Sequence, residues 1–140
     1  MEIPNYGLND WVSALKPYQT SSINSLLESN DPENSIKLWL SANGSEGTIQ
    51  FGGASDNSSE PFWERFSEEF RKFVCGDESY DKFRSQLSTE APIAKTIYIS
   101  VISAALGATL GYAATLLAPA IALMLHLVGT MGKNAWCNAN

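Results

Sequence analysis

The chain has few of the residues that catalytic and metal sites require. Its 140 residues include one histidine and two cysteines, and Cys75 and Cys137 stand far apart without the close spacing of a zinc or redox motif. There is no phosphate-binding glycine motif followed by lysine. These absences predict a protein that is not an enzyme and that holds no cofactor or metal, with its two cysteines as unpaired thiols.

Positive charge is also scarce and unevenly placed. All 15 acidic residues and seven of the nine basic residues fall within residues 1–90, and the formal net charge is −6. Binding to a nucleic-acid backbone needs clustered lysine and arginine, so the sequence excludes nucleic acid as a partner. The acidic balance otherwise indicates only solubility.

The first eleven residues, MEIPNYGLNDW, contain no basic segment followed by an apolar run. They therefore predict no secretory signal peptide. Together with unpaired thiols, this favours a location in the cytoplasm or at the cytoplasmic face of a membrane.

Residues 1–90 read as short helices separated by turn residues. Asn9 or Asp10 is expected to cap a first helix that Pro17 ends, and a second helix is expected to begin near residues 20–22. Asp31 followed by Pro32 is the clearest helix start, because aspartate caps free N–H groups and proline needs no donor in the first turn.

Residues 43–60 are dominated by glycine and serine. This composition predicts a loop or irregular hairpin. Only residues 48–51 alternate as a short strand would.

Residues 61–76 predict an amphipathic helix that begins at Pro61 and stops at Gly76. Its aromatic stripe has two interpretations, a core face or a surface that binds a protein partner. The partner-binding candidates are Phe62, Trp63, Phe66, Phe70 and Phe73.

The 37 residues between Lys95 and Lys133 contain no charged side chain. One helix of that length would span about 55 Å, well beyond the roughly 30 Å of bilayer hydrocarbon. Two antiparallel arms of about 16 to 18 residues fit a membrane better, and they would place both lysines on one face. We therefore expect an apolar helical hairpin, with Pro119 beginning or kinking its second arm.

Gly107 and Gly111 have the small-xxx-small spacing that lets helices approach closely, so we expect them at a helix-packing face that closes the hairpin or joins copies of the chain. His126, without an acidic partner nearby, is expected to be a neutral, hydrogen-bonded side chain.

The sequence as a whole predicts a mainly α fold. An acidic helical domain over residues 1–90, with its glycine/serine loop and possible short strand, precedes an apolar helical hairpin with a short polar tail over residues 91–140. We expect a membrane-associated, non-enzymatic module that binds a protein partner through the acidic domain and uses the hairpin as an anchor, an oligomerisation element or a membrane effector. The alternative is a soluble structural or adaptor subunit whose hairpin packs against partner subunits.

Overall fold

The computed structural model describes residues 3–41, 59–87 and 94–138, and within these ranges the secondary structure is helical, without strands. The mainly α prediction is confirmed. The possible strand at 48–51 and most of the glycine/serine loop lie outside the described residues. The helices are α1 (Leu8–Val12), α2 (Pro17–Leu27), α3 (Pro32–Leu40), α4 (Ser59–Cys75), the 3-10 helix η4 (Glu78–Tyr80), α5 (Asp81–Ser85), α6 (Lys95–Leu110), α7 (Ala114–Met131) and α8 (Lys133–Asn138).

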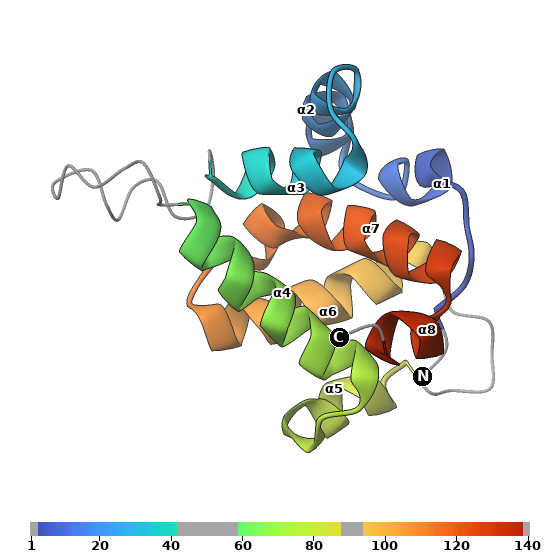
Figure 1. Ribbon diagram of the computed structural model, residues 1–140, viewed down its shortest axis with the longest axis vertical. Helices are drawn as coiled ribbons and strands as arrows, with labels where there is room; N and C mark the ends of the chain where they lie inside the picture. Colours follow the sequence, from blue (N-terminus) through green and yellow to red (C-terminus); the bar gives the residue numbers. More distant parts are fainter. Residues whose placement is uncertain (1–2, 42–58, 88–93, 139–140) are drawn as a thin grey trace, which may run out of the picture.

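Helix α7 forms the centre of the fold. It packs against α6, α3 and α1, with further contacts to α2 and α8, while α4 packs across α6 and α3 (Figure 1). Six consecutive residues of α7, from Ala120 to Leu125, are buried, because neighbours cover the helix on all sides at this level. This arrangement explains why α7 is apolar around its whole circumference rather than along one stripe.

Local signals correctly placed several helix ends. The Asp31 side chain accepts a hydrogen bond from the Asn34 N–H at 2.8 Å, and Pro32 is the first residue of α3. Gly76 follows α4 with a φ of +103°, a conformation that favours glycine. These positions confirm the predicted start of α3 and stop after α4.

The first two helices differ from the prediction. Gly7, rather than Asn9 or Asp10, precedes α1, and the Asp10 carboxylate accepts a hydrogen bond from the Gly7 N–H at 3.3 Å. Pro17 begins α2 instead of ending α1, which already stops at Val12. Proline fits both the residue after a helix and the first turn of the next, and the second role applies here.

The buried side chains before and after residue 90 belong to one hydrophobic core. For example, Trp11 in α1 packs edge-to-face on Tyr98 in α6, with ring centroids 6.1 Å apart. The expected boundary between 90 and 91 lies outside the described residues. A division into separately folding parts stays a prediction.

The two cysteines form a disulfide, so the prediction of unpaired thiols is wrong. Cys75 at the end of α4 is bonded to Cys137 in α8, with Cα atoms 5.8 Å apart. The packing of α4 against α8 brings together two residues separated by 62 positions. Sequence spacing could not reveal this pairing, because it depends on where the two helices lie in the fold.

Candidate functional site

The backbone hydrogen bonding of α7 is interrupted in its first turns, and a neighbouring helix supplies the missing donor. Pro119 lies inside α7 and has no N–H, so the Thr115 carbonyl loses its usual helical donor. The Gln19 side chain of α2 replaces it, donating from Nε2 to the Thr115 oxygen at 2.8 Å. Gln19 is only 2% exposed, and its Oε1 accepts the Lys16 backbone N–H at 3.1 Å.

A second side chain binds the adjacent carbonyl. Trp39 of α3 donates from Nε1 to the Leu116 oxygen at 2.7 Å. Two helices from the acidic part of the chain are therefore held to the N-terminal end of α7 by hydrogen bonds as well as by apolar packing. We call Gln19 and Trp39, with the carbonyls they bind, the proline-break contacts.

Gln19 and Trp39 carry no local pattern that marks them in the sequence, although Pro119 is a signal that points toward such donors. A proline at position 119 of a helix implies a carbonyl at position 115 without its helical partner. The donor itself could not be inferred, because Gln19 is 96 positions away in the chain.

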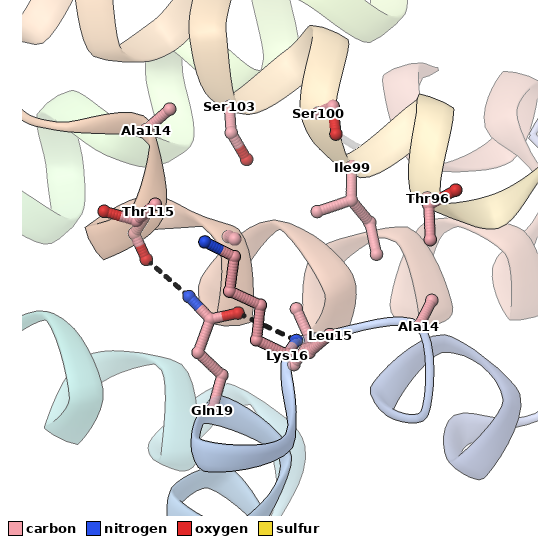
Figure 2. Close-up of a pocket in the computed structure, with 11 residues that line it drawn as sticks. Ala14, Leu15, Lys16, Gln19, Thr96, Ile99, Ser100, Ser103, Ala114 and Thr115 are labelled. Atoms are coloured by element: carbon pink, nitrogen blue, oxygen red, sulfur yellow. Dashed lines mark hydrogen bonds between the residues drawn. The ribbon is translucent and has the colours of Figure 1, made fainter.

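A pocket of about 310 Å³ lies beside these contacts. The α1–α2 connection, α2, α6 and the first turns of α7 form its walls. Leu15, Ile99 and Ala118 give it an apolar lining, and Figure 2 shows the Ser103 hydroxyl and the Lys16 amine directed into the space between α6 and α2. The pocket therefore joins the covering helices to the α6–α7 pair.

The N-terminal segment covers the other end of α7. A Cβ placed on Gly129 would lie 2.6 Å from the Pro4 carbonyl oxygen, so glycine permits this close approach of two backbones. His126 Nδ1 lies 3.4 Å from the Tyr6 carbonyl oxygen, as expected for a hydrogen-bonded histidine. The Lys95 ammonium lies over the Tyr6 ring, 4.7 Å from its centroid. Both ends of α7 are thus contacted by residues that precede it by about a hundred positions.

The structure places the aromatic stripe of α4 mostly in the core. Four of its phenylalanines are buried, and of the five partner-binding candidates only Trp63 is partly exposed. Two of its phenylalanines pack edge-to-face on aromatic side chains far along the chain: Phe62 on Tyr112, with ring centroids 4.7 Å apart, and Phe70 on Trp136, with ring centroids 5.8 Å apart. These contacts fit the core interpretation, while partner binding through Trp63 stays a prediction.

Gly107 and Gly111 both lie where α6 turns toward α7, and they serve the turn in different ways. A Cβ on Gly107 would lie 2.6 Å from the Tyr112 carbonyl oxygen, so this glycine is a point of close contact within the chain. Gly111 has open space around it but a φ of +83°, and it ends α6 in the left-handed conformation. A role for either glycine between copies of the chain stays a prediction.

Substitution of these glycines should separate the two roles. Gly107→Ala is expected to lower the free energy of unfolding by about 1 to 3 kcal/mol, because the added methyl group meets backbone that must shift. Gly111→Ala should cost about 1 to 2 kcal/mol from the left-handed conformation alone, and Gly111→Asn should cost less, since asparagine tolerates that conformation. Urea unfolding measures all three. If Gly107→Ala changed only the association state in sedimentation experiments, the residue would face another copy instead.

Glu69 of α4 belongs to a hydrogen-bond network with Tyr80 and Thr109. Glu69 accepts a hydrogen bond from the Tyr80 hydroxyl at 2.6 Å, and the Thr109 hydroxyl of α6 lies 3.0 Å from the same tyrosine oxygen. Burial, with the hydrogen bond to Glu69, raises the pKa of Tyr80 to about 12. The network ties α4 and η4 to α6.

Within the described residues there is no group of three or more histidine, cysteine or acidic side chains able to hold a metal ion. The fold and its contacts define a class: an all-α protein in which the other helices surround a central apolar helix. No protein family, curated protein or solved structure matches this chain.

Proposed function

We propose that this protein is a non-enzymatic, membrane-associated module whose α6–α7 pair is an apolar hairpin. In the soluble form the helices α1 to α4 and α8, which we call the cover, pack against this hairpin. The hairpin is able to enter a bilayer when the cover moves away from it. The hairpin then anchors the protein, joins copies of it or acts as a membrane effector. The covering helices bind a protein partner, for which the partly exposed Trp63 is the candidate contact.

One observation carries this proposal. Among the described helices, α7 is long and apolar enough to cross a membrane, and half of it is buried inside the protein. Its 18 residues would span about 27 Å, close to the hydrocarbon thickness of a bilayer. Apart from α6, the helices that contact it have no more than 11 residues each, and hydrogen bonds at the proline break supplement the apolar contacts of two of them.

The second candidate is a soluble structural or adaptor subunit. The central helix of a soluble protein meets the same criteria of length and composition, and the burial of Ala120 to Leu125 suits that role equally well. In this case the partner is a protein surface alone, and lipid plays no part. The two candidates differ in what happens when α7 becomes uncovered.

The disulfide bears on localisation. The prediction of a cytoplasmic location depends partly on unpaired thiols. A disulfide, in contrast, persists mainly in oxidising compartments. We propose that the bonded form works in an oxidising environment and meets a membrane from that side. A cytoplasmic membrane face remains the prediction for the reduced protein.

Weakening the cover should expose the hairpin. Gln19→Ala leaves the Thr115 carbonyl without its donor, and we expect it to lower the free energy of unfolding by about 1 to 3 kcal/mol. Flotation with phosphatidylcholine vesicles should recover a larger share of this variant than of the wild type, in a form that resists carbonate washing. Asp77→Ala is the matched control, because it removes the bond from the Ser79 N–H that Asp77 accepts at 2.9 Å, away from the proline break.

The two candidates predict different outcomes. If the protein is a membrane module, the Gln19→Ala variant should bind vesicles more than the Asp77→Ala variant does at equal loss of stability. Lower stability without vesicle binding, for both variants, would contradict the membrane proposal and leave the adaptor candidate. Leu123→Arg provides a further check when it is combined with Gln19→Ala. The added charge in the second arm opposes insertion, so it should reduce the vesicle binding of the Gln19 variant.

A further inference from the structure

The pocket between the α1–α2 connection, α6 and α7 has the features of a binding site for a small amphipathic anion. We infer that it binds a monocarboxylate with an unbranched apolar chain of about eight carbons. This ligand is a separate matter from membrane association, and its binding is measured without lipid.

A buried hydroxyl group without a hydrogen-bond partner faces the pocket. Ser103 is only 2% exposed, and no hydrogen-bond partner for its Oγ exists among the described residues. Buried hydroxyl groups are nearly always hydrogen-bonded, so an unpaired one that faces a pocket indicates a missing acceptor or donor. Figure 2 shows this hydroxyl pointing from α6 into the pocket.

The pocket also has a positive charge at its wall. The Lys16 side chain reaches into the same space, and among the described residues no carboxylate pairs with its ammonium. None of the described residues that line the pocket is acidic. An anion in the pocket could therefore accept hydrogen bonds from two donors, the charged Lys16 ammonium and the neutral Ser103 hydroxyl.

The lining and the size of the pocket suit a short apolar chain. Leu15 and Ile99 are nearly fully buried and leave aliphatic surface for an apolar chain. Small-molecule sites commonly occupy about 300 to 1,000 Å³, and the pocket lies at the low end of that range. A pocket of this size accommodates octanoate, a small ligand with ten non-hydrogen atoms.

The first experiment titrates the oxidised, full-length protein with sodium octanoate, butanoate and 1-octanol, using calorimetry and amide chemical shifts. We expect saturable one-to-one binding of octanoate, with the shifts concentrated over residues 15–19 and 96–103. Each buried methylene should contribute about fourfold in affinity, so butanoate should bind far more weakly. Octanol should also bind more weakly, because it brings no negative charge to Lys16.

Variants then assign the contacts. Lys16→Met should weaken octanoate binding by about three- to tenfold, whereas Lys82→Met, at an exposed lysine of α5, should leave it unchanged. Ser103→Ala should weaken binding by about two- to tenfold without lowering the melting temperature of the free protein, since it removes an unpaired buried group. Ala118→Leu should fill the pocket and abolish binding while the protein stays folded.

Three results would overturn the inference. One is no saturable response to octanoate; another is equal binding of octanol and octanoate; the third is octanoate binding that Ser103→Ala and Ala118→Leu leave unchanged. A negative titration leaves the vesicle experiment unaffected, because that experiment contains no added ligand. Failure of the membrane proposal likewise leaves the calorimetric result intact.

Discussion

Loss of the Cys75–Cys137 disulfide is expected to lower the free energy of unfolding by about 4 kcal/mol. The bond closes a loop that spans 62 positions, and the chain-entropy relation gives this magnitude for a loop of that length. Urea unfolding with and without a reductant measures the difference. Cys75 is exposed, so a phosphine reductant should reach the bond in the folded protein.

A double variant, Cys75→Ser with Cys137→Ser, supplies the control. Its stability should match that of the reduced wild type within about 1 kcal/mol and should not respond to reductant. Thiol titration of the unreduced wild type should detect no free thiol under denaturing conditions. Detection of two thiols would show that the bond does not form in the purified protein.

Phe70→Ala is expected to lower the free energy of unfolding by about 3 to 5 kcal/mol, the usual cost of truncating a fully buried phenylalanine. The substitution opens a cavity between α4 and α8 and removes the edge-to-face contact with Trp136. Trp136 also lies under the Arg71 guanidinium, 4.5 Å from its ring centroid. The loss should therefore loosen the helix that carries Cys137.

Trp63→Ala is the informative comparison, because Trp63 lies in the same stripe but is only partly buried. We expect it to cost less than Phe70→Ala and to leave the cooperativity of unfolding intact. Thermal and urea unfolding, followed by near-ultraviolet circular dichroism, compare the two. Similar small effects for both would mean that the stripe is not a core face, and partner binding would then account for it.

Local chemistry made part of this fold predictable. Asp31 with Pro32 starts a helix, and Gly76 stops one, because caps and left-handed glycines act within four or five residues. The long uncharged segment likewise required two helices rather than one. These features depend on neighbours in sequence, so the sequence alone contains them.

The contacts that hold the helices together were not predictable in the same way. Cys75 meets Cys137, and Gln19 meets Thr115, only after α4, α8, α2 and α7 have packed. Ser103 is one of several serine and threonine residues within the apolar segment, and only the packed structure shows that it faces a pocket. The roles of such residues depend on partners that are distant in the chain. The spacing of residues in the sequence does not show where those partners lie in the fold.

The disulfide also restricts how many times residues 75–137 can cross a membrane. Residues 75–137 and their bridge form a closed covalent ring that contains both α6 and α7. A closed ring crosses any plane an even number of times. While the bond is intact, a crossing of a bilayer by α7 must therefore be matched by a second crossing within the ring, for which α6 is the other apolar helix. A single crossing within residues 75–137 is possible only for the reduced chain.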